Sequence, residues 1–126
     1  MSGPRVLIVD DNALNVALAR CLLEAAGALV DEVPTAVGLE ARVASWQPDV
    51  LLLDLRLPEL DGLTAMLRLR AAETDRRLPI AAFTAHAMKG AAAMLRSAGF
   101  DSYLPKPIEA RTFAAQVLAL VGAQPR

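Results

Sequence analysis

The feature that most constrains the fold is a set of short apolar runs, each followed by a segment with helical spacing. Clear examples are residues 6–9, 50–53 and 80–83. Their apolar residues are continuous and do not alternate with polar ones, which is typical of strands covered on both faces. Strict alternation of such strands with helices, through short connections, predicts right-handed crossovers and a doubly wound parallel sheet. We therefore expect an α/β fold.

Five rounds of strand and helix account for nearly the whole sequence. Gly27 and Gly99 stand where helices are predicted to end, and Pro48 stops the second helix. The predicted strands are residues 6–9, 28–33, 50–53, 79–83 and 102–104, and the predicted helices are residues 13–26, 36–46, 62–72, 87–98 and 109–121. No linker, repeat or low-complexity segment interrupts them, so we expect one domain over residues 1–126.

Composition and charge narrow the class of protein. A chain of 126 residues that is 55% hydrophobic is long enough for one compact core. No apolar stretch approaches the ~20 residues that a membrane-spanning helix needs, and the amino terminus lacks the apolar region of a signal peptide. We therefore expect a cytoplasmic protein. Its 13 basic and 14 acidic residues give a net charge of −1, so direct binding to nucleic acid or to an anionic membrane is not expected.

Two single residues carry structural expectations. The lone Cys21 has no partner for an internal disulfide, and its helical neighbours Leu18, Leu22 and Ala25 predict a buried thiol. Trp46 closes the second predicted helix and is expected to lie away from the polar strand ends described next.

Polar residues follow the first, third, fourth and fifth predicted strands. They are Asp10, Asp11, Asp54, Thr84 and Lys106. Ligand and catalytic groups in open parallel sheets gather outside the carboxyl ends of the strands, so these side chains are expected to meet at one edge. The sequence therefore predicts one acidic site with one cationic side chain.

Three carboxylates in one place repel one another unless a cation lies between them. Ligands that are all oxygen favour a hard ion, and a few carboxylates suit Mg²⁺, with Mn²⁺ as a substitute. A metal and a lysine beside a carboxylate suit phosphoryl transfer, with Asp54 as the nucleophile. Thr84 is then expected to donate a hydrogen bond to a phosphoryl oxygen, and Lys106 to pair with another.

Each of these residues also has a plain structural interpretation. Asp11 and Asn12 suit the cap of the first helix, Asp54 suits a turn, Thr84 suits a helix cap, and Lys106 suits a solvated surface. Helix caps and turns do not require all four to occur together at strand ends, and this joint occurrence favours the functional interpretation.

The chain resembles the receiver domains of two-component response regulators over essentially its whole length. The resemblance rests on residues 6–12 (VLIVDDN), 54–62 (DLRLPELDG), 83–85 (FTA) and 103–107 (YLPKP). It implies a flavodoxin-like (βα)5 fold with a five-stranded parallel sheet in the order 2-1-3-4-5. It also implies that Asp54 takes a phosphoryl group from a histidine kinase or a histidine phosphotransfer protein.

The resemblance assigns further roles. Asp11 and Asp54 are expected to bind Mg²⁺ directly, Asp10 largely through water, and the Arg56 backbone carbonyl completes the protein ligands. Tyr103 stands where an aromatic residue reports phosphorylation together with Thr84. The peptide bond between Lys106 and Pro107 is expected to be cis.

Local strings resemble particular branches of the family. Residues 11–15 (DNALN) and 84–90 (TAHAMKG) look like receivers of hybrid kinases and of small single-domain regulators, and the first string suggests a phosphorelay. Arg56 and His86 lie at positions that in the family influence how long the phosphoryl group survives. The alternative for both is an ordinary side chain at the rim of the site.

The leading hypothesis is a phosphorylation-dependent switch without an output domain, acting as a monomer or as a phosphorylation-dependent dimer on a downstream protein partner. Its output face is predicted over residues 87–98, 102–104 and 109–121. The last segment has more apolar positions than one buried stripe needs, so some are expected to be exposed: Phe113, Ala114, Val117, Leu118, Leu120 and Val121.

Two alternatives come from other classes of protein. A receiver-like scaffold that acts without phosphorylation is disfavoured by the complete acidic set. An aspartate-nucleophile phosphatase is expected to have a second acidic residue where Arg56 stands, and a flavin site is expected to have a loop rich in Ser, Thr or Gly after the first strand. The start at Met1 and the tail of residues 122–126 favour a free-standing protein.

Overall fold

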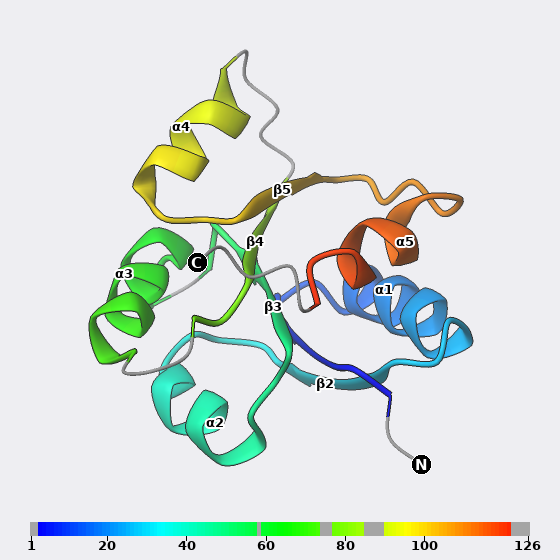
Figure 1. Cartoon of the computed structure of the whole chain (residues 1–126), viewed down its shortest axis with the longest axis horizontal. Coiled ribbons are helices and arrows are strands. Elements are labelled where there is room, and N and C mark those ends of the chain that lie inside the picture. The colour runs from blue at the N-terminus through cyan, green and yellow to red at the C-terminus, as the bar shows by residue number, and fades with distance from the viewer. Residues whose placement is uncertain (1–2, 58, 74–76, 85–89, 122–126) are drawn as a thin grey trace.

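The computed structural model describes residues 3–57, 59–73, 77–84 and 90–121. A five-stranded parallel sheet runs through the centre in the order β2-β1-β3-β4-β5, with helices on both faces (Figure 1). The strands are β1 (Arg5–Val9), β2 (Leu29–Val33), β3 (Val50–Asp54), β4 (Ile80–Thr84) and β5 (Ser102–Pro105). The predicted doubly wound architecture and the order 2-1-3-4-5 are confirmed.

The helices are α1 (Ala13–Ala25), α2 (Leu39–Trp46), α3 (Gly62–Ala72), α4 (Ala91–Ala98) and α5 (Phe113–Leu118). Two clusters of buried apolar residues form the core. One packs α1 and α5 against one face of the sheet, and the other packs α2, α3 and α4 against the opposite face. No helix among the described residues is long and apolar enough to span a membrane.

The central strands confirm the interpretation of the continuous apolar runs. Every residue of β3 and β4 is buried. Because successive side chains of a strand point to opposite faces, a strand covered on both sides needs apolar residues at every position. These two strands end on Asp54 and Thr84, which are buried with the rest of their strands.

The helices differ from prediction mainly at their ends. α2 begins at Leu39 and not at residue 36, because Gly38 has a left-handed backbone (φ 78°) and Val37 donates its N–H to the Thr35 hydroxyl (3.1 Å). The described part of α4 begins after Gly90, and residues 87–89 of the predicted helix lie outside the described residues.

The last helix is shorter than the predicted residues 109–121 and is more buried than expected. Turns flank α5 on both sides. The expectation that some of its six apolar residues are exposed is wrong, because all of them are buried or packed partly buried against the α1 and α5 cluster. Within the part of the predicted output face that the structure describes, the large apolar residue that is exposed is Met94 of α4, at 69%.

Cys21 is exposed, so the predicted buried thiol is wrong. The buried residues of α1 are Val16, Ala19 and Leu23. At 100° per residue, Cys21 lies about 200° around the helix from both Ala19 and Leu23, which places it on the opposite side. Of the apolar neighbours that suggested burial, Leu18 and Ala25 are also exposed, whereas Leu22 packs partly buried against the core.

A glycine lets α3 approach the end of β3 closely. A Cβ atom at Gly62 would lie 2.2 Å from the Asp54 carbonyl oxygen and 2.8 Å from the Leu55 Cα. The Gly62 N–H donates to the Leu55 carbonyl oxygen (3.1 Å), and the Asp61 carboxylate caps the helix by accepting from the Thr64 N–H (2.8 Å). The loop after Asp54 is thereby held against the start of α3.

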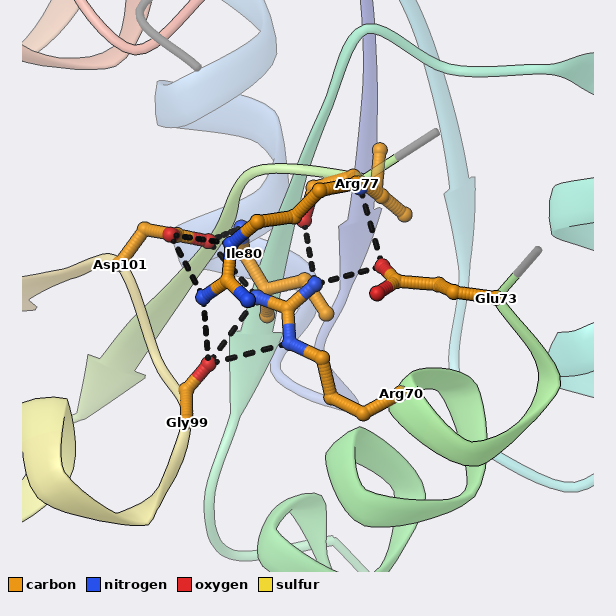
Figure 2. A network of polar contacts seen from close by, with 7 residues as sticks. Arg70, Glu73, Arg77, Ile80, Gly99 and Asp101 are labelled. Carbon is orange, nitrogen blue, oxygen red and sulfur yellow. Dashed lines mark hydrogen bonds and ion pairs between the residues drawn. The ribbon is translucent and has the colours of Figure 1, made fainter. Parts of the chain in front are cut away.

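A polar network ties the amino ends of β4 and β5 to α3 (Figure 2). The Asp101 carboxylate accepts from Arg70 Nη2 (2.7 Å), from Arg77 Nη2 (2.9 Å) and from the Ile80 N–H (2.8 Å). Arg70 also donates to the Gly99 carbonyl oxygen from Nη2 (3.0 Å). Asp101 is therefore the shared acceptor that joins three segments distant in sequence.

We predict that Asp101→Asn lowers the free energy of unfolding by about 2 kcal/mol, because charged hydrogen bonds from two arginines are weakened in a largely buried position. Urea denaturation followed by circular dichroism measures the change. Glu24→Gln is the matched control, because the Arg20–Glu24 pair on α1 is exposed and should contribute less than about 0.5 kcal/mol. Equal losses in the two variants would contradict the structural role of Asp101.

Candidate functional site

The charged residues of the site extend the side-chain rows that face α1 and α5. Each lies two positions beyond an apolar residue of that cluster: Asp10 beyond Ile8, Asp54 beyond Leu52, and Lys106 beyond Leu104. Side chains two apart in a strand share a face, so the apolar rows lead directly to a row of charges at the carboxyl edge. The prediction that these residues meet at one edge is confirmed.

Lys106 joins the two buried carboxylates. Its Nζ lies 2.8 Å from Asp10 Oδ2 and 3.1 Å from Asp54 Oδ2. Asp10 and Asp54 are 3% and 5% exposed, and the Lys106 side chain is 11% exposed. The interpretation of Lys106 as a solvated surface lysine is therefore wrong. In these surroundings the charges interact more strongly than in water.

Each carboxylate also accepts a hydrogen bond from the backbone just after it. Asp10 Oδ1 accepts from the Asn12 N–H (2.9 Å), and Asp54 Oδ1 accepts from the Arg56 N–H (2.9 Å). The remaining oxygen of Asp10, Oδ2, is buried and accepts no hydrogen bond from the described residues, although it forms an ion pair with the Lys106 ammonium. This oxygen retains capacity to bind a cation.

Burial raises the pKa of Asp54, and the negative charge of Asp10 raises it further. The Arg56 N–H and the Lys106 ammonium act in the opposite direction by stabilising the carboxylate. Desolvation is the largest of these effects. The ionised form of Asp54 is thus held at a cost in free energy.

Asp11 completes the acidic cluster, which we define as Asp10, Asp11 and Asp54. One oxygen atom from each lies within 4.8 Å of the others, and Asp11 is exposed. Asn12, and not Asp11, caps α1 by accepting from the Asn15 N–H (3.0 Å). Three carboxylates with only oxygen donors, including the unsatisfied Asp10 Oδ2, fit a hard divalent cation.

Thr84 and Tyr103 lie on the other face of the sheet. Thr84 is 1% exposed and lies two positions after Ala82, so the two side chains share a face. Ala82 pairs in register with Tyr103 on β5, which places Tyr103 on that face as well. Tyr103 packs partly buried against the cluster under α2, α3 and α4. The Lys106 N–H donates to the Thr84 carbonyl oxygen (2.9 Å), so the ends of the two strands are joined beside the acidic cluster.

The remaining predicted residues have mixed outcomes. The peptide bond between Lys106 and Pro107 is cis, as expected. Arg56 is exposed near Asp54, and the role of its carbonyl group stays a prediction. His86 lies outside the described residues. Trp46 lies beneath the Arg5 guanidinium, near the amino end of β1 and away from the acidic cluster, as expected.

Two contacts near the site were missed by sequence reasoning. The Lys106 Nζ lies 4.8 Å from the centroid of the Phe83 ring, although Phe83 had counted only as an apolar strand residue. The Thr35 hydroxyl donates to Glu59 Oε1 (3.2 Å), which connects the loops after β2 and β3. The position of Phe83 directly before Thr84 was the available signal for the first contact.

Comparison with known proteins identifies the family. The sequence profile of the response regulator receiver domain matches residues 6–118. The chain belongs to this family. It is therefore a receiver domain of two-component systems, and its acidic cluster is typical of the phosphoacceptor and Mg²⁺ site of such domains. This result does not favour the phosphorylation-independent scaffold, the phosphatase or the flavin-binding protein.

The relatives of this receiver domain are of two kinds. It is 42% identical over 123 residues to the sensor protein GacS of Pseudomonas syringae pv. syringae, covering 95% of the chain but only 14% of GacS. It is 39% identical over 119 residues to the polar-differentiation response regulator DivK of Brucella ovis, covering 93% of the chain and 95% of DivK.

Solved structures agree with the fold. The receiver domain of the sensor histidine kinase PA1611 from Pseudomonas aeruginosa PAO1 matches with a TM-score of 0.84 and 32% identity, over 97% of this chain and all of that one. That structure has a magnesium ion coordinated in its active site cleft. A response regulator from Chloroflexus aurantiacus matches with a TM-score of 0.86 and 29% identity, over 95% and 99% of the two chains.

We predict that Asp54→Asn raises the free energy of unfolding at pH 7, without divalent cations, by about 1 kcal/mol, a usual size for one stabilising substitution. The folded pKa of Asp54 lies above its unfolded value of about 3.9. Between these two values the folded state binds more protons, so stability falls as pH rises through that window. The advantage of the variant should therefore be complete above the folded pKa and vanish below about pH 4.

Urea denaturation from pH 3 to pH 8 in the presence of EDTA checks this expectation. Asp61→Asn is the control with the opposite sign, because the Thr64 N–H lowers the pKa of the Asp61 carboxyl. Its wild-type contribution is present above the unfolded pKa and is lost as pH falls through the folded pKa. An Asp54→Asn variant that is no more stable than the wild type at pH 7 would contradict the cost of burying the charge.

Proposed function

We propose that this receiver, a single domain over residues 1–126, accepts a phosphoryl group on Asp54 from a phosphohistidine of a histidine kinase or histidine phosphotransfer protein. A carboxylate oxygen of Asp54 forms a bond to phosphorus, the bond from phosphorus to the imidazole nitrogen breaks, and the imidazole takes up a proton. The observation that carries this proposal is the geometry of Asp54, a buried carboxylate 3.1 Å from an ammonium and beside two further carboxylates.

The acidic cluster supplies the metal site in this proposal. Asp10, Asp11 and Asp54 would hold Mg²⁺ together with the Arg56 backbone carbonyl, with Mn²⁺ as a substitute. Bound Mg²⁺ neutralises charge on the transferred group. Support comes from the unsatisfied Asp10 Oδ2, the oxygen-only donors and the magnesium in the PA1611 receiver.

The phosphoryl oxygens are held by two side chains that reach the site from different strands. Lys106 already lies beside Asp54 Oδ2, and we propose that its ammonium forms an ion pair with one phosphoryl oxygen. The Thr84 hydroxyl donates a hydrogen bond to another phosphoryl oxygen. Arg56, exposed two residues after Asp54, and His86 are our candidates for setting the lifetime of the phosphoryl group.

The output follows from the second face of the sheet. When Thr84 moves toward the phosphoryl group, it leaves space on the face that it shares with Tyr103, and the tyrosine ring turns inward. The surface of α4, β5 and α5 then differs between the two states and binds a downstream protein partner differently. The protein catalyses its own phosphorylation and dephosphorylation and has no other enzymatic activity in this proposal.

The two kinds of relative support a role in a phosphorelay. GacS is a sensor protein that contains a similar segment, whereas DivK is a response regulator of nearly the same length. The net charge of −1 is consistent with protein partners and with no direct nucleic acid or membrane binding. We place the exchange in the cytoplasm, with the receiver as a monomer or a phosphorylation-dependent dimer.

We predict that acetyl phosphate with Mg²⁺ adds one phosphoryl group to the wild type and that Asp54→Asn abolishes the addition. Asp54 lies beside Lys106 and within the acidic cluster, and it is the carboxylate to which the resemblance to receiver domains assigns the phosphoryl group. Intact mass and Phos-tag mobility measure the product, and EDTA should suppress it. Asp61→Asn is the matched control, because this exposed helix cap lies outside the acidic cluster and should leave the rate unchanged.

Acid-labile phosphate that persists in Asp54→Asn, mapped to another residue by mass spectrometry, would refute the assignment of Asp54. Unchanged Mg²⁺ affinity in Asp11→Ala, followed by NMR shifts of the residues at the strand ends, would refute the metal role. Trp46 fluorescence is unsuited to that titration because Trp46 lies near the opposite edge.

We also predict that beryllofluoride with Mg²⁺, a mimic of the phosphoryl group, shifts the amide resonances of α4, β5 and α5 more than those of α2. Thr84 precedes the loop into α4, and Tyr103 and Lys106 belong to or adjoin β5, so the change should spread to these elements. Heteronuclear NMR with and without the mimic measures the shifts. Largest changes on α2, or changes that stop at the acidic cluster, would show that the proposed output face is wrong.

A further inference from the structure

The Lys106 ammonium has an aromatic neighbour in addition to its two carboxylates. Its Nζ lies over the ring of Phe83, 4.8 Å from the centroid. Phe83 is fully buried and pairs in register with Asp54 on β3 and with Leu104 on β5. The ring therefore lies on the same face of the sheet as the charged row, level with Asp54 and two positions before Lys106.

The ring restricts where the ammonium can be. Asp10 Oδ2 and Asp54 Oδ2 attract it from 2.8 Å and 3.1 Å, and the face of the Phe83 ring occupies another side. The face of an aromatic ring carries negative potential, and its attraction for a cation is larger when water is excluded. An aliphatic side chain at this position would offer the desolvated charge no such compensation.

The Phe83 ring also contacts α5. The Phe113 ring lies 6.0 Å from that of Phe83 with a tilt of 37°, and Phe113 is 2% exposed. A tilted pair at this separation is a favourable aromatic contact. Among the described residues, the order of contact from the helix to the site is Phe113, Phe83 and Lys106.

We propose that Phe83 is a positioning residue that fixes the Lys106 ammonium between Asp10 and Asp54 through its ring face. It touches neither the phosphoryl group nor the metal and acts on the reaction through Lys106. The effect on phosphorylation rests on the function proposed above for Asp54. The position of the ammonium does not rest on that function, so the positioning role of Phe83 and the phosphorylation of Asp54 can be refuted separately.

The competing explanation is that Phe83 only fills the core between the sheet and α5. Fluorinated phenylalanines, introduced at position 83 by site-specific incorporation, distinguish the two. Successive fluorines weaken the negative potential of the ring face and change its shape little, so they reduce a cation–π contact without creating a cavity. The same series at Phe113 is the matched control, since that ring belongs to the same buried cluster.

The first measurement is the rate of phosphorylation by acetyl phosphate with Mg²⁺. A desolvated cation–π contact of the usual strength predicts a stepwise fall of about tenfold in total from phenylalanine to trifluorophenylalanine at position 83. The series at position 113 should stay within about twofold, as should the Mg²⁺ affinity in both series, because the acidic cluster is unchanged. Equal slopes at the two positions, or a flat series at position 83, would overturn the proposal.

The second measurement needs no phosphorylation. The sequence has two lysines, Lys89 and Lys106, so labelled lysine gives two sets of side-chain NMR signals, and Lys89 serves as the reference. The Lys106 ε-methylene should carry a ring-current shift that Phe83→Leu removes and Phe113→Leu retains. If the wild type takes no phosphoryl group, the proposed function fails and this shift alone decides the role of Phe83. An unchanged Lys106 signal in Phe83→Leu would refute it.

Discussion

The pairing of one ammonium with two buried carboxylates is the constraint on which the site depends. Lys106 lies close to both Asp10 and Asp54, yet one oxygen of Asp10 stays without a hydrogen bond and burial raises the pKa of Asp54. The lysine therefore offsets only part of the cost of gathering these charges. A site in this condition gains free energy when a cation binds, which is the property that a receiver needs.

The residues of the site lie on both faces of the sheet. The charged row lies above the cluster under α1 and α5, whereas Thr84 and Tyr103 lie on the face under α4. A group bound at Asp54 and contacted by both Lys106 and Thr84 joins these faces at one edge. The Asp101 network holds the amino ends of β4 and β5 at the opposite edge, so a change at the site is directed toward α4 and the carboxyl end of β5.

Local signals in the sequence were reliable where one cause decides the outcome. Continuous apolar runs required strands covered on both faces, and the polar residues that end them marked the functional edge. Predictions of which helix residues are buried were wrong where tertiary packing sets the buried face. Cys21 has apolar neighbours on its own helix, but the buried face of α1 is set by the residues that meet the sheet. The apolar residues of α5 that suggested an exposed patch are instead packed against the core.

The sequence by itself determined the alternation of strands and helices along the chain, the edge at which the functional residues gather and the chemistry of the acidic cluster. These follow from periodicity and from residue type, which act over a few neighbouring positions. Only the tertiary structure decided that Phe83 lies beneath Lys106, that Asp101 joins two arginines to β4, and that Gly62 allows α3 to approach Asp54. Such contacts join residues distant in sequence, and they depend on how sheet and helices pack in three dimensions, which no local pattern specifies.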